Sequence, residues 1–336
     1  MLRGALLGVG NVAVNGHLPG WRAASGVTLA AAADARTDGK AAFLDAFPTA
    51  RWYGSAEELL RTERELDFAD IATPPALHAP LVRQAIAAGL HVLCEKPLVL
   101  APEEIPELAS LAAQKGRALV PVHNWKHATA LAKLTELVGS GEVGEVRRCR
   151  WETLRLRPAV AAGDEGNWRV DPAQSGGGIL MDHGWHALYM VASWLGTAVR
   201  SVRASLTTRK HRSFRIEDTA AVTLEYASAS AEIFLTWAAD ERANRIVIEG
   251  TRGRVTLDGG HVRLVAGAAP REFDLASIAE GSHHPEWFGG VVEDFLSEVT
   301  DPARRGSGLA EASFCASVMA LSAESQRRAG QPVTTA

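Results

Sequence analysis

Cysteine is scarce in this sequence, and the three that occur, Cys94, Cys149 and Cys315, lie far apart along the chain. An odd number at such spacing favours neither a disulfide framework nor a thiolate zinc site. Positive charge is not in excess either, because the formal net charge is −4. Composition therefore gives no electrostatic argument for a nucleic-acid partner or a membrane surface. The sequence also has no apolar run of transmembrane length.

Residues 1–4 lead directly into a predicted strand, without the charged, apolar and cleavage regions of a signal peptide. We therefore expect a cytoplasmic protein whose cysteines are small core residues in a reducing compartment. The length of 336 residues allows two domains with sizeable cores. The hydrophobic fraction of 47% and the charged fraction of 22% are ordinary for a globular protein.

A glycine-rich turn follows the first predicted strand, with the sequence Gly8-Val9-Gly10-Asn11-Val12-Ala13. Gly8 permits a tight turn, and Gly10 allows a pyrophosphate to approach the backbone. The first amides of the following helix can then hold phosphates. We assign Gly8, Gly10, Asn11 and Val12 to cofactor binding on this basis. The glycine pattern alone is weak evidence for a dinucleotide site. Its position between a predicted strand and a predicted helix strengthens that evidence.

Asp34 ends the second predicted strand, residues 27–33. A dinucleotide-binding fold places at this point the acid that accepts the adenosine ribose hydroxyls. A carboxylate there repels a 2′-phosphate, which favours NAD. Arg36 could pair with such a phosphate and leaves NADP open. The alternative for Asp34 is a helix cap or a turn residue.

Apolar strands alternate with helices through the first third of the chain. Strands are predicted at 68–73, 91–94 and 118–122, and helices at 76–88 and 102–115. This alternation predicts a doubly wound parallel sheet, which binds ligands at the carboxyl ends of its strands. The polar residues at or just beyond such ends are Thr73, His78, Glu95 and Lys96. We assign these four residues, and Arg36, to cofactor binding.

Strands dominate the second half of the chain. They are predicted at 146–156, 199–207, 219–226, 231–238, 245–249, 254–257 and 261–265. Short strands with tight links indicate an antiparallel sheet. Helices are predicted at 286–299 and 309–328. We therefore expect an α/β Rossmann domain at 1–122 and an α+β domain at 123–336, and leave open whether the C-terminal helix packs back on the first domain.

The stretch from Gly176 to His186 contains three consecutive glycines and then an apolar helix that ends at Gly196. Asp182 and His186 are four residues apart and share one helix face. A carboxylate that accepts a hydrogen bond from one imidazole nitrogen leaves the other nitrogen to move a proton. A structural hydrogen bond within a core or on a surface is the alternative for this pair.

Taken together, these motifs resemble the Gfo/Idh/MocA family, the glucose–fructose oxidoreductase and inositol dehydrogenase group. The segments that carry the resemblance occur in the family's order over nearly the whole chain: residues 8–13, 72–75 with His78, 88–92, Glu95-Lys96-Pro97, and 167–169 with 176–186. The resemblance implies a nucleotide-binding domain followed by an open-faced, mostly antiparallel sheet that often forms the oligomer interface. It also implies a homo-oligomer, a dimer or tetramer.

The resemblance further implies an NAD(P)-dependent oxidoreductase that acts on a secondary alcohol of a sugar or cyclitol, or on the corresponding ketone. Lys96 matches the lysine that contacts the reacting oxygen, and Asp182 and His186 match the acid/base pair. The cofactor residues that it adds are Pro74 and Asn124. The residues assigned to the substrate besides these three are Trp125, Lys126, Trp168, Arg169 and His183.

Several positions depart from the family pattern. Lys126 stands where an arginine is usual, Tyr189 stands where an acid is frequent, and His183 adds a second imidazole. Whether Tyr189 or His183 shares the acid/base role stays open. Arg155, Arg157 and Arg169 could pair with a substrate carboxylate or phosphate, and a solvated strand face is the alternative for the first two.

Histidines at 183, 186, 283 and 284 raise the alternative of a metal site. The acid/base interpretation already uses Asp182 and His186, and a third ligand cannot be placed, so we expect no metal. Two further functions stay open: a glycosidase that oxidises its substrate transiently with bound NAD, and a non-catalytic regulator on the same fold. The substrate, its ring position and the physiological direction do not follow from the sequence.

Overall fold

The computed structural model describes residues 1–159, 167–281 and 283–335. The chain divides into two compact units, which we call the first and the second unit. The first unit consists of Met1–Asn124 and His283–Ala312, and the second consists of Trp125–Ser282 and Ser313–Ala336. The chain therefore returns to the first unit before it ends in the second.

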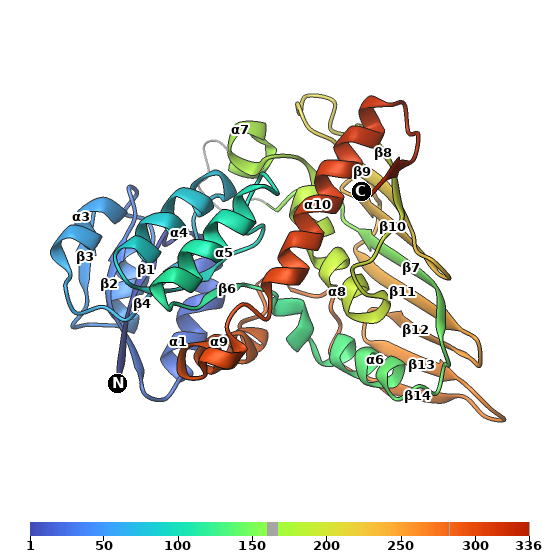
Figure 1. Cartoon of the computed structure of the whole chain (residues 1–336), viewed down its shortest axis with the longest axis horizontal. Helices are drawn as coiled ribbons and strands as arrows, with labels where there is room; N and C mark the ends of the chain where they lie inside the picture. The colour runs from blue at the N-terminus through green and yellow to red at the C-terminus, as the bar shows by residue number, and fades with distance from the viewer. Residues whose placement is uncertain (160–166, 282, 336) are drawn as a thin grey trace. The chain divides into compact units, whose positions relative to one another are not determined.

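A parallel sheet of six strands forms the centre of the first unit (Figure 1). Its spatial order is β3-β2-β1-β4-β5-β6, and every neighbouring pair is parallel. The strands are β1 (Leu2–Leu7), β2 (Val27–Ala33), β3 (Arg51–Tyr53), β4 (Phe68–Ile71), β5 (His91–Cys94) and β6 (Leu119–Pro121). The strand order reverses between β1 and β4, which is where doubly wound sheets bind ligands.

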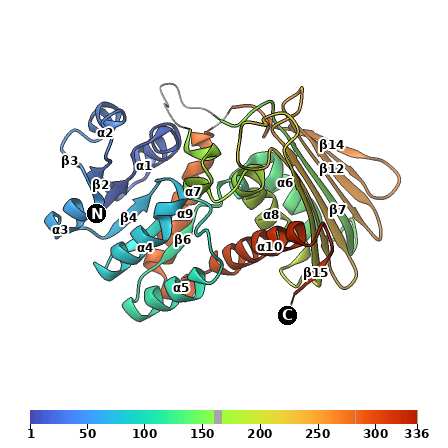
Figure 2. The same cartoon turned by 90° about the horizontal axis from the view of Figure 1, so that it is seen from above.

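Helices cover both faces of this sheet: α1 and α9 pack together on one face, and α4 and α5 lie side by side on the other (Figure 2). Phe288 and Phe295 of α9 lie edge-on to Trp21 of α1, with ring centroids 6.1 and 5.9 Å apart. The bounds are η1 (Ala13–His17), α1 (Leu18–Ala23), α2 (Lys40–Ala46), α3 (Ala56–Thr62), η2 (Pro75–Leu77), α4 (His78–Ala87), α5 (Glu104–Lys115), α9 (Pro285–Thr300) and η6 (Pro302–Arg304).

The second unit contains a sheet of nine strands in the order β14-β13-β12-β11-β7-β10-β9-β8-β15. Only the β7–β10 pair is parallel among these described strands. The strands are β7 (Val146–Leu154), β8 (Ser201–Thr207), β9 (Thr219–Glu225), β10 (Ser230–Thr236), β11 (Ala243–Gly250), β12 (Arg254–Asp258), β13 (His261–Val265), β14 (Arg271–Asp274) and β15 (Val333–Thr334).

One face of this second sheet packs against helices α6, α8 and α10 (Figure 2). Between the helices and the sheet lies a core in which Trp151, Trp185, Tyr189 and Trp237 are fully buried. In the part of the chain that the structure describes, no helix covers the opposite face. The remaining bounds are η3 (Asn124–His127), α6 (Thr129–Gly139), η4 (Trp168–Val170), α7 (Pro172–Ser175), η5 (Leu180–Gly184), α8 (Trp185–Leu195) and α10 (Leu309–Arg327).

The predicted fold class is confirmed, because a parallel Rossmann sheet is combined with a large, mostly antiparallel sheet. All three cysteines are buried, as expected. The sequence analysis missed α2, β3 and β14. These elements are short, and β14 is an edge strand whose residues are mostly exposed, so it lacks the apolar alternation that marks a half-buried strand. No helix among the described residues is both long and apolar enough to span a membrane.

Candidate active site

The glycine turn in the first unit connects β1 to η1. Gly8 has a φ of 88°, and a Cβ at this position would lie 2.8 Å from the backbone nitrogen of Thr73. Both the conformation and the close approach of the next strand's end therefore require glycine. Around Gly10 the space is open, because the nearest heavy atom to an added Cβ is an Arg36 guanidinium nitrogen at 3.9 Å. The turn thus leaves room beside its backbone.

Asp34 holds this turn from the end of β2. Its Oδ2 accepts a hydrogen bond from the Val9 N–H at 2.7 Å, and its Oδ1 accepts one from the Arg36 N–H at 2.8 Å. Each carboxylate oxygen can accept a second hydrogen bond. Asp34 therefore both fixes the glycine turn and keeps acceptor capacity for ribose hydroxyls.

Two polar atoms at the ends of other strands are buried without a hydrogen-bond partner among the described residues. They are Oγ1 of Thr73, beyond β4, and Oδ1 of Asn124, beyond β6. An unsatisfied buried polar group costs about 1–3 kcal/mol. Both residues were predicted to bind the cofactor. A polar ligand at this edge of the sheet would supply the missing hydrogen-bond partners of these two oxygens.

His78 lies in the interior, between two loops of the same edge. Its Nδ1 is 2.7 Å from the carbonyl oxygen of Pro97, and its Nε2 is 2.8 Å from that of Thr73. Burial lowers the pKa of His78. Both ring nitrogens face backbone oxygens, so the structure places this residue as a link between the two loops. Pro74 begins the η2 turn beside it, and the Lys96–Pro97 peptide bond is cis.

Lys96 follows β5 and is attached to a buried chain of polar groups. The Lys96 N–H donates to Oε2 of Glu95 at 3.0 Å, and Oε1 of Glu95 lies 3.1 Å from Nε2 of His17. On its other side, His17 Nδ1 lies 2.8 Å from Oδ2 of Asp70, to which Trp21 Nε1–H also donates at 2.6 Å. We call His17, Asp70 and Glu95 the buried ionic chain.

The sequence analysis missed His17 and Asp70. A signal was present, since Asp70 interrupts a strand that is otherwise wholly apolar and buried. A carboxylate in such a strand requires a partner. The sequence does not show which residue supplies it, because His17 lies on η1, far away along the chain.

In the second unit, the three-glycine turn is built around Glu217. The Gly178 N–H lies 3.0 Å from both carboxylate oxygens of Glu217, and the Leu180 N–H donates to Oε1 at 3.1 Å. A Cβ on Gly178 would lie 1.8 Å from the Glu217 carbonyl oxygen. Burial raises the pKa of Glu217, while these backbone N–H groups lower it. Glu217 therefore anchors the start of the helix that carries Asp182 and His186, a role the sequence analysis missed.

His186 lies at the start of α8, which ends before Gly196 as predicted. Its Nδ1 is 3.0 Å from the hydroxyl oxygen of Tyr189, and that oxygen accepts the Trp125 N–H at 3.0 Å. The Trp125 ring stacks on the imidazole, with centroids 4.7 Å apart and planes inclined by 11°. The structure thus brings Trp125, His186 and Tyr189 together.

Asp182 and His183 lie on the π-helical segment η5, directly before α8. The charge of Asp182 acts on Arg155. Burial and the charge of Arg242 lower the pKa of Arg155 to about 9, and Asp182 opposes that shift. Asp182, His183 and His186 belong to the second unit and Lys96 to the first, so the predicted catalytic set draws on both units.

Arg155 is buried and donates to the Ala243 carbonyl oxygen and to Oδ1 of Asn244, at 3.0 and 2.7 Å. The alternative of a solvated strand face is therefore wrong for this residue. Arg169 lies over the Trp168 ring, 4.4 Å from its centroid, and both residues are half-buried. Lys126 is half-buried on η3. Among the described residues, no three His, Cys, Asp or Glu side chains are placed to hold a metal ion.

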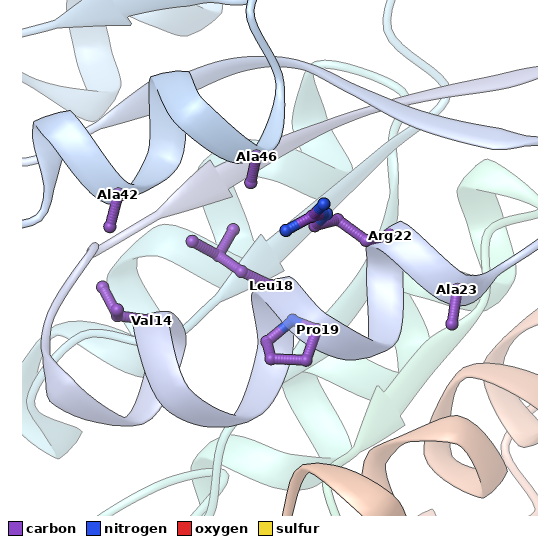
Figure 3. A pocket seen from close by; sticks show the side chains of 7 residues that line it. All are labelled: Val14, Leu18, Pro19, Arg22, Ala23, Ala42 and Ala46. Carbon is purple, nitrogen blue, oxygen red and sulfur yellow. The ribbon is translucent and has the colours of Figure 1, made fainter.

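A hollow of 470 Å³ lies on the first unit between η1, α1 and α2 (Figure 3). Arg22 is its one charged lining residue among six apolar ones. None of its lining residues was predicted to bind cofactor or substrate. They are Val14, Leu18, Pro19, Arg22, Ala23, Ala42 and Ala46.

Both the sequence and the fold are similar to those of known proteins. Residues 2–123 match the model of an oxidoreductase family with an NAD-binding Rossmann fold, and residues 131–256 match the GFO/IDH/MocA C-terminal domain. An uncharacterized oxidoreductase of Synechocystis sp. is 30% identical over 75% of this chain and 66% of its own length. The chain thus spans just under two thirds of that relative.

A D-apiose dehydrogenase of Paraburkholderia graminis is 26% identical, over 77% of this chain and 68% of its own. A levoglucosan dehydrogenase solved in complex with NADH has a TM-score of 0.85 at 19% identity, covering 100% of this chain and 99% of that one. At this identity, the structural match shows the shared fold.

The contact between Gly178 and Glu217 generates a prediction about stability. We expect Gly178→Ala to lower the free energy of unfolding by about 1–3 kcal/mol, because the added Cβ meets backbone atoms that cannot move aside alone. Gly177→Ala is the matched control, since its Cβ would make only an ordinary 3.4 Å contact with Met181. Urea denaturation measures both, and equal stability of the two variants would contradict the close approach.

Proposed function

The chain belongs to the GFO/IDH/MocA family of oxidoreductases, whose N-terminal domain is an NAD-binding Rossmann fold, and from this premise we propose its reaction. The protein transfers hydride between NAD and a secondary alcohol or ketone of a sugar, a sugar derivative or a cyclitol. The match of residues 2–123 to the NAD-binding domain is the observation that carries the proposal. Relatives named for D-apiose and levoglucosan support a polyhydroxylated substrate.

The first unit fits a dinucleotide. Its glycine turn has open space at Gly10, and Asp34 at the end of β2 can accept further hydrogen bonds. The buried side-chain oxygens of Thr73 and Asn124 have no hydrogen-bond partner among the described residues and can bind a polar ligand. When bound, NAD supplies the carbon that accepts or returns the hydride. The chain's own residues bind and orient the substrate and move its proton.

We assign Lys96 Nζ to the reacting oxygen, where an ammonium stabilises developing negative charge. We assign the exchange of the hydroxyl proton to His186, whose Nδ1 lies 3.0 Å from the Tyr189 hydroxyl oxygen. A hydroxyl both donates and accepts hydrogen bonds, so Tyr189 can partner either tautomer of His186 in both directions of the reaction. Asp182 supports the acid/base role through its charge. Trp125, Lys126, Trp168, Arg169 and His183 are assigned to the substrate.

The test is turnover with a panel of sugars, inositols, uronates and their keto forms, followed by nicotinamide absorbance. With the best substrate, we expect Lys96→Met and His186→Asn each to lower kcat by about 10²- to 10⁴-fold, because each removes a group at the reacting oxygen. The Kd for NAD should stay within about threefold, since neither change alters the glycine turn.

Lys115→Met is the matched control, because Lys115 is an exposed lysine of the same unit. Wild-type kcat in both test variants would refute the assignment. Cleavage of a glycoside without net cofactor reduction would instead support the NAD-dependent glycosidase. NAD binding without turnover of any compound in the panel would support the regulator.

Cofactor preference provides a second prediction, because a carboxylate at position 34 repels a 2′-phosphate. We expect Asp34→Asn to lower the ratio of kcat/KM for NAD to that for NADP by about tenfold, with Arg36 left to pair with the phosphate. Asp38→Asn removes the same charge from an exposed residue near Arg36 and serves as control. An unchanged ratio in Asp34→Asn would remove Asp34 from the ribose site.

We also propose that the protein forms a homo-oligomer through the uncovered face of the second unit's sheet. Cross-strand ion pairs lie on this face, such as Arg148–Glu232 at 2.5 Å and Arg150–Glu249 at 3.7 Å. Phe234 of β10 alternates with two buried neighbours and therefore points to the same face. An apolar ring among paired charges suits contact with a second copy. The cytoplasmic location stays a prediction.

A change on this face should alter the oligomeric state. Val247 of β11 is half-buried and alternates with the buried Ile246 and Ile248, so Val247→Arg places a second cation in the interface, opposite Arg150 of β7. We expect light scattering to detect a dimer or tetramer for the wild-type protein and a smaller species for the variant. Asp274→Ala on the edge strand β14 is the control. A monomeric wild-type protein would refute this interface.

A further inference from the structure

His17 occupies the middle of the buried ionic chain. It is 1% exposed, and Asp70 beside it is fully buried. The two ring nitrogens of His17 face two different carboxylates, Asp70 at 2.8 Å and Glu95 at 3.1 Å. A neutral imidazole has a single N–H, and only the imidazolium can donate from both nitrogens. With both carboxylates ionised, this geometry favours a charged ring.

The charge of His17 is consistent with its surroundings. Burial by itself lowers the pKa of His17, but the charges and hydrogen bonds of Asp70 and Glu95 raise it to about 10. Two aromatic side chains lie beside this pair: Trp21 donates to the same oxygen of Asp70, and the Phe288 ring lies 4.2 Å from the imidazole. His17 is thus a cation through the physiological pH range.

Glu95 links this cation to the backbone that carries Lys96. One carboxylate oxygen faces His17, and the other accepts the Lys96 N–H at 3.0 Å. We propose that His17 is a positioning residue for Lys96, which it holds in place through Glu95. The residue does not contact the reacting atoms, and the proposal rests on the proposed function in that Lys96 is taken to act on the substrate oxygen.

Loss of the His17 charge would change the ionisation of Glu95. Burial raises the pKa of Glu95, whereas His17, Lys96 and the more distant His78 lower it. Without His17, the largest of the contributions that lower it is lost, so the pKa of Glu95 rises above its present value. The variant's Glu95 therefore becomes protonated at a higher pH and then binds the Lys96 N–H less strongly.

Amide hydrogen exchange by NMR tests the positioning without reference to activity. We expect His17→Asn to accelerate exchange of the Lys96 amide by roughly tenfold. Exchange at Val92, whose N–H donates to the Ala118 carbonyl oxygen at 2.9 Å, should stay unchanged. His91→Asn replaces a buried histidine of β5 in the same unit and should leave the Lys96 amide as in the wild-type protein. Equal Lys96 exchange in His17→Asn and wild type would overturn the proposal.

Kinetics test the consequence for the reaction. We expect His17→Asn to lower kcat by roughly 10- to 100-fold with little change in the KM for NAD. The loss should deepen as the pH is lowered, because Glu95 of the variant becomes protonated at a higher pH than Glu95 of the wild-type protein. The double variant His17→Asn, Glu95→Gln has no carboxyl at position 95, although Asp70 remains, and it should lose the part of the pH dependence that Glu95 causes. The same pH dependence in both variants would refute the role of Glu95.

The wild-type protein also provides a test, should His17→Asn fail to fold. Imidazole ¹⁵N shifts at pH 8 should identify His17 as doubly protonated, and a neutral ring would overturn the proposal. If the wild-type protein has no activity on any substrate but the exchange and ¹⁵N results are as expected, the positioning of Lys96 stands and the proposed reaction fails. Normal kcat in His17→Asn with accelerated exchange would show that Lys96 positioning has no catalytic role.

Discussion

Hydrogen bonds from backbone amides to carboxylates hold three turns that carry predicted site residues. Asp34 accepts the amide after Gly8, Glu95 accepts the amide of Lys96, and Glu217 accepts the amides that start the His186 helix. Such charge-assisted bonds are about twice as strong as neutral ones. A loop held in this way keeps a defined backbone where chemistry needs side chains in fixed positions.

These three carboxylates differ in how their charge is compensated. Asp34 is at the protein surface, while Glu95 is paired with the His17 cation. Glu217 has backbone dipoles as partners, and burial raises its pKa. The free-energy cost of burying these charges is therefore offset in different ways. Of these three carboxylates, Glu95 is the one paired with a histidine, His17, beside the predicted catalytic Lys96.

Whether the sequence indicates a structural feature depends on how far apart in the chain the interacting residues are. Apolar alternation along the chain indicated the two sheets, and the order of strands and helices indicated the doubly wound topology. The residues around the predicted site followed the same rule, since Asp34, Lys96 and His186 each follow a local motif. Partners across the fold had no such signal: Tyr189 on Trp125, Glu217 on Gly178 and His17 on Glu95 each join residues through packing.

By itself, the sequence determined the fold class, the glycine turn, the strand ends that carry polar residues and the family resemblance, because these depend on short-range patterns of apolar, glycine and charged residues. Only the tertiary structure decided which carboxylate holds each turn and that Arg155 is buried. It also decided that the buried Asp70 faces a histidine from a distant segment. The physical reason is that burial and charge pairing arise when separate strands and helices pack, and no local pattern specifies the partner.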